Sequence, residues 1–321
     1  MIRLRLLGPL HLVTRDGSEA RAVLTQPKRL ALLAYLAIGA PGGFHRRDAL
    51  LALFWPESTE SHARLALRQS LYHLRRTLGR EVIVRRGRDE LALAAGMVWC
   101  DVLAFRQALA AGHAHAALDL YAGDLLDGFS FSGISLELER WLDDARATLR
   151  TLAARAAASL SQRAAEIGEL SRAVEWARRA LALSTDDEPV LRHLVRLLDR
   201  QGNRAAALRT VQDFTHRTLR ELAAEPAAET KALADEIRSR ATARPLSDAT
   251  VLDDVAAAGL APMQQRRAAV ARGHGVVSHR GAADQAVGSR RRTGGGRVPT
   301  FLVSLLIAGG LGAVVARLRG S

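Results

Sequence analysis

Apolar side chains recur at steps of three and four between residues 63 and 78, which places them on one face of an α-helix. The apolar positions are Ala63, Leu67, Leu71, Leu74 and Leu78. A second set recurs at the same steps on another face: Arg64, Arg68, Tyr72 and Arg75, with Gln69, His73 and Arg76 flanking it. The pattern predicts a helix that buries leucines on one side and presents arginines on another.

A short β-hairpin is predicted directly after this helix. Residues 81–84 and 91–93 have strand-forming composition, and the segment between them is basic. The basic side chains at the expected tip are Arg85, Arg86 and Arg88. A basic helix followed by a basic hairpin is the layout of a winged helix-turn-helix, in which the helix enters the major groove of DNA and the wing lies on the backbone.

The residues before the basic helix fit the same layout. Short apolar runs bounded by turn residues predict strands at 2–7, 10–14 and 21–24. A helix is expected to open at Pro27, and a second helix covers 46–54. The predicted order is therefore three strands, three helices and a hairpin.

From Asp101 to about Ser239 the apolar period stays close to 3.6, which predicts a continuous series of helices. Two breaks, each opened by a glycine, begin at Gly168 and Gly202, 34 residues apart. This is the period of tetratricopeptide repeats, so we expect a tetratricopeptide-like α-helical repeat domain. The alternative is that two unrelated helical hairpins share this spacing by chance.

The last part of the chain changes in composition. Residues 244–297 are rich in Pro, Gly, Ser, Ala and Arg, which predicts a flexible, disordered basic linker. The stretch 298–316 contains no charged residue and is long enough to cross a bilayer as a transmembrane helix. An amphipathic or merely hydrophobic tail, and a non-native C-terminus caused by a frame change, are the competing interpretations.

Charge is unevenly distributed along the 321 residues, whose formal net charge is +13. The net charge is +8 over residues 1–95, −2 over 96–243 and +7 over 244–321. The asymmetry favours a polyanionic partner for the N-terminal part, although a generally basic proteome is the alternative.

Cys100 is the single cysteine, so the chain can form neither an internal disulfide nor a cysteine-based zinc site. Its apolar neighbours indicate a small buried residue rather than a nucleophile. The N-terminus lacks the apolar core of a signal peptide, and we expect a cytoplasmic location. If the apolar tail inserts, the protein is tethered to the membrane.

Candidate DNA-binding residues follow from the basic helix, the hairpin and the starts of the first two helices. They are Arg64, Arg68, Gln69, Tyr72, Arg75, Arg76, Arg85, Arg86, Arg88, Lys28, Arg46 and Arg47. Arginine can bridge two acceptors on a guanine edge, and the hairpin arginines suit phosphate contacts. A merely solvated polar face is the alternative for the helix, and ordinary surface charge is the alternative for the three residues at the helix starts.

Catalytic patterns are missing from the sequence. It contains no paired carboxylates, nucleophile with a base, or phosphate-binding GxxxxGK[ST] loop at usable spacing. The histidines lack metal-ligand spacing, and the tryptophans at positions 55, 141 and 176 fall where core residues are expected. We therefore expect no enzyme activity, cofactor or metal.

Several stretches resemble a known family. They are LRLLGPL (4–10), PKRLALLAYLA (27–37), LFWPES (53–58), ARLALRQSLYHLRRTLG (63–79), Asp101-Val102 with Phe105, LDLYAGDLLDGF (118–129), ELERWLDDAR (137–146) and Leu219 to Thr230. The first five resemble the N-terminal half of SARP-type and AfsR-type regulators, and the rest resemble their bacterial transcriptional activator domain. The resemblance covers about residues 1–240 and does not reach the last 80 residues.

The resemblance implies an OmpR/PhoB-like winged-helix domain over 1–95 joined to a bacterial transcriptional activator domain over 96–243. It also implies activation at direct repeats, occupied by a homodimer, and contacts with RNA polymerase. The fold class expected from all these features is mainly α with a small β component. The resulting hypothesis is a transcriptional regulator that binds double-stranded DNA, with helical repeats for oligomerisation, effector sensing or polymerase contact. The alternative is a scaffold or adaptor protein that uses the repeats and has lost sequence-specific DNA binding.

Overall fold

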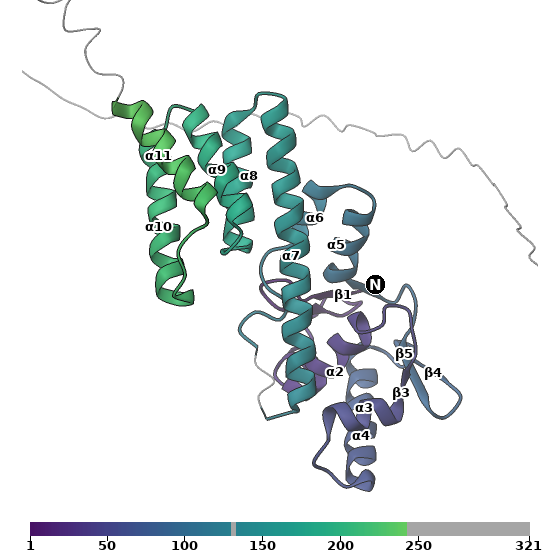
Figure 1. The fold of residues 1–321 in the computed structure, drawn as a ribbon. Coiled ribbons are helices and arrows are strands. Elements are labelled where there is room, and N and C mark those ends of the chain that lie inside the picture. Colours follow the sequence, from purple (N-terminus) through teal and green to yellow (C-terminus); the bar gives the residue numbers. More distant parts are fainter. Residues whose placement is uncertain (130–132, 243–321) are drawn as a thin grey trace, which may run out of the picture. The chain divides into compact units, whose positions relative to one another are not determined.

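The computed structural model describes residues 1–129 and 133–242 (Figure 1). The fold is mainly α-helical with a small β component, as the sequence predicts. The predicted linker at 244–297 and the apolar stretch at 298–316 lie outside the described residues. Among the residues that are described, no helix combines the length and apolar character that crossing a membrane requires.

The N-terminal part contains a three-stranded sheet with the order β2-β1-β6. Its strands are β1 (Ile2–Arg5), β2 (His11–Val13) and β6 (Val98–Cys100). β1 pairs antiparallel with β2 and parallel with β6, so the first and last strands of this part of the chain lie side by side.

The strand predicted at 21–24 is wrong, because these residues form the short helix α1 (Arg21–Leu24). Their amides are bonded locally: the backbone nitrogen of Val23 donates to the carbonyl of Ala20 at 2.9 Å, and that of Thr25 to the carbonyl of Arg21 at 3.0 Å. A run of four residues holds too few apolar positions to distinguish a period of two from one of 3.6.

The three predicted helices are confirmed, and a second three-stranded sheet lies beside them (Figure 1). The helices are α2 (Pro27–Ile38), α3 (Arg47–Phe54) and α4 (Glu60–Leu78). The strands are β3 (His45–Arg46), β4 (Ile83–Arg86) and β5 (Glu90–Leu93), in the order β3-β5-β4. The predicted hairpin tip needs correction: β4 continues through Arg86, so Arg85 and Arg86 lie in the strand and only Arg88 lies in the turn.

The apolar stripe of α4 is confirmed. Its five predicted members are each at most 4% exposed: Ala63, Leu67, Leu71, Leu74 and Leu78. They belong to the same hydrophobic core as Leu30, Leu33 and Phe54 of the two preceding helices. Burial of this face fixes the rotation of α4 about its axis, and therefore the direction in which its arginines point.

Up to residue 242, where the described part of the chain ends, seven helices follow β6, as the sequence predicts in outline. They are α5 (Asp101–Ala110), α6 (Ala114–Leu120), α7 (Leu136–Glu166), α8 (Leu170–Leu183), α9 (Glu188–Arg200), α10 (Arg204–Leu222) and α11 (Ala228–Thr242). The prediction of continuous helix fails between α6 and α7, where the described residues are irregular.

The two glycine breaks predicted from the 34-residue spacing are turns between paired helices. Gly168 joins α7 to α8 with a φ of +81°, and Gly202 joins α9 to α10 with a φ of +77°. Alanines after these turns are fully buried: Ala173, Ala177, Ala180 and Ala207. Their small side chains let the paired helices approach closely.

Two hydrophobic clusters hold the described residues together. The first includes side chains from Ile2 to Ala157 and also Ala180, and the second runs from Ala164 to Ile237. The predicted boundary after residue 95 therefore lies inside one continuous core. Trp55 is 9% exposed and belongs to that core, while Trp141 and Trp176 pack against it, as predicted.

A buried carboxylate joins the N-terminal sheet to the first helix after it. Asp101 is 2% exposed and accepts hydrogen bonds from the backbone amides of Leu6 and Leu7 at 2.9 Å and of Val102 at 2.8 Å. Burial raises the pKa of Asp101, and these three amides oppose the rise. The carboxylate thus fixes the end of β1 against the start of α5.

The segment after α6 packs across the same strand end. The amide of Gly8 donates to the carbonyl of Asp124 at 2.9 Å, and the amide of Leu126 donates to the carbonyl of Leu6 at 2.7 Å. A side chain of α7 completes the connection, because the guanidinium of Arg146 donates to three carbonyls between residues 125 and 129 at 2.8–2.9 Å. The segment after α6 is therefore held between the end of β1 and α7.

Replacing Asp101 with alanine is expected to destabilise the fold strongly. The change leaves three buried amides without an acceptor, which costs roughly 3 kcal/mol or more in the free energy of unfolding. Urea denaturation followed by circular dichroism measures the loss. Asp127→Ala, at an exposed position, is the control and should change stability by less than about 0.5 kcal/mol. Equal effects of the two changes would contradict the role of Asp101.

Gly123→Ala is expected to destabilise the crossing of two backbone segments. A Cβ at this position would lie 2.9 Å from the Cα of Gly8, a backbone atom that cannot rotate away. We expect a loss of about 1–3 kcal/mol, measured by thermal and urea denaturation. At Gly112 a Cβ meets no atom within 4 Å, and the φ of +76° lies in the left-handed region, which Asn tolerates better than other side chains do. Gly112→Asn should therefore cost less than about 1 kcal/mol. A neutral Gly123→Ala variant would show that the crossing adapts.

Candidate nucleic-acid interface

The pairing of the hairpin strands sorts its arginines onto two faces. Across the sheet, Arg85 lies opposite Leu91, which lies opposite His45. Residues directly opposite each other share a face of a sheet, and successive residues alternate between faces. Because Leu91 and His45 are buried, Arg85 lies on the inward-facing side. By the same register Arg86, Glu90 and Arg46 share the outward side.

A groove of about 960 Å³ lies between the second half of α4 and strand β4. Its lining residues are Arg68, Tyr72, Arg75, Arg76, Gly79, Arg80, Ile83 and Arg85. Arg75 connects the two sides, since its Nη2 donates to the carbonyl oxygen of Ile83 at 3.0 Å. Tyr72 is 60% exposed, an unusual position for a large aromatic side chain unless it contacts a partner.

The arginines near α4 and the hairpin fall into two groups: those that form an ion pair with a carboxylate and those that do not. Outside the groove, Arg46 pairs with Asp48 at 3.9 Å, Arg64 donates from Nε to Glu60 at 2.8 Å, and Arg86 pairs with Glu90. In the groove, Arg68, Arg75, Arg76, Arg80 and Arg85 have no ion pair with any carboxylate of residues 1–129 and 133–242. Glu81, next to the groove, pairs with Arg15 instead. The groove therefore has uncompensated positive charge.

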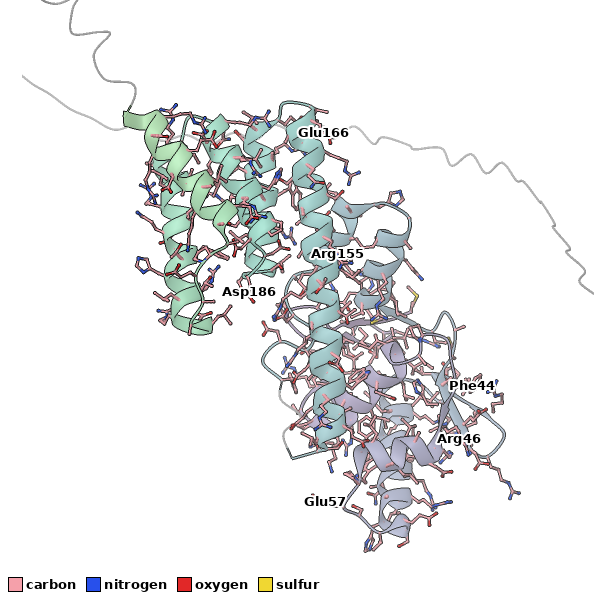
Figure 2. The ribbon with its side chains drawn as sticks, viewed as in Figure 1. Phe44, Arg46, Glu57, Arg155, Glu166 and Asp186 are labelled. Carbon is pink, nitrogen blue, oxygen red and sulfur yellow. The ribbon has the colours of Figure 1, made fainter. Side chains whose placement is uncertain are left out.

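Arg86 has a second contact that holds it away from the groove. Its guanidinium carbon lies 4.4 Å from the centre of the Phe44 ring. Phe44 and Arg46 both lie beside the hairpin strands (Figure 2). With Glu90 on one side and an aromatic face on the other, Arg86 contributes to the conformation of the hairpin.

Partial burial and repulsion between like charges change the pKa of two arginines, Arg75 in the groove and Arg47 at the start of α3. The pKa of Arg75 is lowered by burial and by the charges of Arg85 and Arg47. The pKa of Arg47 is lowered by burial and by Arg85, with smaller effects of Arg64 and Arg68. These side chains come from α3, α4 and β4, so the fold brings together charges that are up to 38 residues apart in the sequence.

The structure brings together five of the twelve predicted residues in one groove: Arg68, Tyr72, Arg75, Arg76 and Arg85. Gln69 and Arg88 are exposed on α4 and in the hairpin turn. Arg80 was missed by the sequence analysis. The available signal is that Gly79 ends α4, so that the residue after it leaves the helix and turns toward β4.

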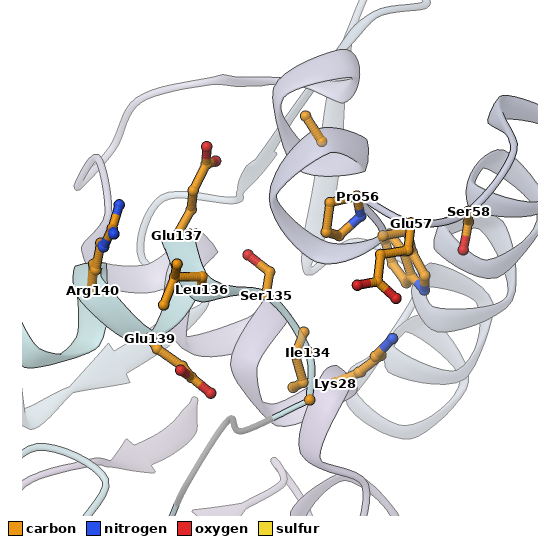
Figure 3. A pocket seen from close by; sticks show the side chains of 13 residues that line it. Lys28, Pro56, Glu57, Ser58, Ile134, Ser135, Leu136, Glu137, Glu139 and Arg140 are labelled. Carbon is orange, nitrogen blue, oxygen red and sulfur yellow. The ribbon is translucent and has the colours of Figure 1, made fainter.

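Lys28 lies elsewhere. It lines a separate pocket of about 790 Å³ formed by the loop between α3 and α4 and by the start of α7 (Figure 3). Its Nζ lies 5.9 Å from the centre of the Trp55 ring. Glu57, Glu137 and Glu139 line the same pocket, so it is not a continuation of the basic groove.

Cys100 is buried, as predicted, with 3% of its surface exposed. Burial, with the neighbouring carboxylate of Asp101, raises the pKa of its thiol to about 12. A thiol with this pKa stays protonated at neutral pH and is a poor nucleophile. Within the described residues, no three His, Cys, Asp or Glu side chains are grouped so that they could hold a metal ion.

Comparisons with known proteins gave a family match and a similar solved structure. Residues 102–238 match the family described as the bacterial transcriptional activator domain. A solved structure of Mycobacterium tuberculosis EmbR, in complex with a low-affinity phosphopeptide, has a similar fold: the TM-score is 0.54 and the sequence identity 22%, over 80% of this chain and 69% of that chain. No curated protein sequence matches the chain.

The match covers the stretches 118–129, 137–146 and 219–230, which the sequence analysis related to this domain.

Proposed function

We propose that the protein is a transcriptional activator that binds promoter DNA through the groove between α4 and β4. One observation carries this proposal: five arginines line the groove, and none of them is paired with a carboxylate of the described residues. Such a surface is costly to maintain unless a polyanion neutralises it, and the DNA backbone supplies regularly spaced negative charges.

The proposed contacts follow from the two sides of the groove. Arg68, Tyr72 and Arg76 on α4 face the base edges in the major groove, where arginine can donate two hydrogen bonds to guanine. Arg85 on β4 and Arg88 in the hairpin turn contact the backbone. Gln69 and Arg64 extend the contact along α4, and Arg64 exchanges Glu60 for DNA when it binds. Arg46 and Arg86 lie on the opposite side of the hairpin sheet from Arg85, and Lys28 lies in another pocket, so we place these three outside the DNA contact.

The helical part supplies the remaining functions in this proposal. We assign residues 1–95 to the DNA-binding domain and 96–243 to a tetratricopeptide-like activator domain that contacts RNA polymerase. We further propose that the protein acts in the cytoplasm and binds direct repeats as a homodimer. The match of residues 102–238 to the activator domain supports the assignment of the helical part.

Binding of duplex DNA by the full-length protein should depend steeply on salt. If six to eight phosphates are neutralised, affinity is expected to fall by roughly 10³–10⁴ between 50 and 200 mM salt. The double variant Arg68→Ala, Arg76→Ala removes two exposed charged donors, and we expect it to bind about a hundredfold more weakly. Fluorescence anisotropy with fragments of the native genome measures both effects.

The control for this experiment is Arg172→Ala, which removes an exposed, ion-paired arginine on α8. It should leave DNA affinity unchanged, and circular dichroism should show native folding for all variants. If the wild-type protein shifts no duplex at 50 mM salt, or if the double variant binds as tightly as the control, the scaffold alternative is favoured and the proposal is wrong.

A further inference from the structure

Arg47, Arg75 and Arg85 form a cluster at the junction of three elements. Arg47 is the first residue of α3, Arg75 lies in the last turn of α4, and Arg85 lies in β4. The junction is fixed by the backbone, because the amide of Arg47 donates to the carbonyl of Asp89 in the hairpin turn at 2.7 Å. Arg85 lies on the side of the sheet that carries Leu91 and His45. Its charge acts on both Arg47 and Arg75, which places the three side chains near one another.

The three guanidinium groups keep most of their donors unused. Arg75 commits one Nη2 donor to the carbonyl of Ile83. The Nε of Arg47 is buried and has no hydrogen-bond partner among the described residues. None of the three forms an ion pair with a carboxylate in the described part of the chain, and the charge of Asp89 acts on Arg47 only from beyond ion-pairing distance.

Such a cluster is unfavourable in the free protein. Like charges repel, and a buried donor without an acceptor costs free energy. The charge of Arg85 lowers the pKa of both Arg47 and Arg75, and the charge of Arg47 also lowers that of Arg75. A group with several anionic oxygens reverses both penalties, since it neutralises the charges and accepts from several donors at once. Phosphate matches guanidinium geometry in this way.

We propose that Arg47, Arg75 and Arg85 form a preassembled subsite for one phosphate group. Resting on the proposed function, we assign this group to a phosphodiester of the DNA backbone beside the major groove that α4 enters. The subsite sets the register of α4 on the duplex and contributes equally to all sequences, while Arg68 and Arg76 discriminate between bases. A free phosphorylated ligand carries the same kind of phosphate group, and the experiment below distinguishes such a ligand from DNA.

The test compares the full-length protein with Arg47→Met, which keeps an apolar stem and removes the charge, and with Arg172→Met as a control for net charge. Arg47→Met should weaken binding about tenfold for a bound genomic fragment and equally for an unrelated duplex. The slope of log affinity against log salt should decrease by about 0.9, the contribution of one phosphate. The control should change neither quantity.

Thermal denaturation distinguishes a phosphate subsite from a purely structural role of Arg47. Without DNA, Arg47→Met should melt at a higher temperature than the wild type, because repulsion and an unpartnered donor are removed. Inorganic pyrophosphate at constant ionic strength should stabilise the wild type, and the shift should be at least halved in the variant. Arg85→Met should reproduce these results and serves as the second variant if Arg47→Met does not fold.

The outcomes separate the two proposals. If the wild type binds DNA and the slope of log affinity against log salt is unchanged in both variants, the subsite proposal is wrong. The proposed function is then unaffected. If the wild type binds no duplex but pyrophosphate stabilises it through Arg47, the proposed function and the DNA assignment fail, and the subsite holds a free phosphorylated ligand. If pyrophosphate shifts wild type and variant equally and the slope does not change, the subsite does not exist.

Discussion

The packing of the helical part against the N-terminal sheet depends on hydrogen bonds at the end of strand β1. Two hydrogen-bonded connections meet after β1: the carboxylate of Asp101 binds the amides of Leu6 and Leu7, and the backbone around Gly8 crosses the segment before α7. Both connections join residues about 95–120 positions apart in the sequence. They fix the helical part against the N-terminal sheet, so that α7 packs along the layer formed by α2 and α3. The ring of Trp141 on α7 lies 5.0 Å from that of Tyr35 on α2.

This shared core has a consequence for how the two parts work together. The helix α7 is not joined to the N-terminal part through a flexible linker alone, because its leucines and the core of residues 1–95 belong to one hydrophobic cluster. The helix that carries the arginines is buried against α2 and α3, which in turn contact α7. A partner that displaces α7 would therefore act on the layer that supports α4. Coupling of this kind requires no separate hinge.

Charge is arranged at two levels. Along the sequence, the N-terminal 95 residues carry the excess of basic side chains and the helical part is nearly neutral. Within the N-terminal part, local ion pairs neutralise the arginines that face outward on the hairpin, and the groove keeps those without acidic partners. Surface ion pairs add little to stability. Their effect here is to neutralise Arg46 and Arg86 on the side of the hairpin sheet away from the groove, while the groove arginines keep charges that a polyanion can neutralise.

The sequence by itself determined the features that depend on local periodicity. The buried stripe of α4, the hairpin, the helix starting at Pro27 and the glycine turns 34 residues apart all follow from residue spacing, because helix and strand place side chains at fixed intervals. The tertiary structure decided which arginines meet. Whether Arg85 or Arg86 faces α4 depends on strand register, and the roles of Arg80, Arg47 and Asp101 depend on partners far away in the chain. α1 formed where a strand was predicted because its amides found acceptors locally. Long-range contacts of this kind leave no periodic signal, so only the folded chain shows them.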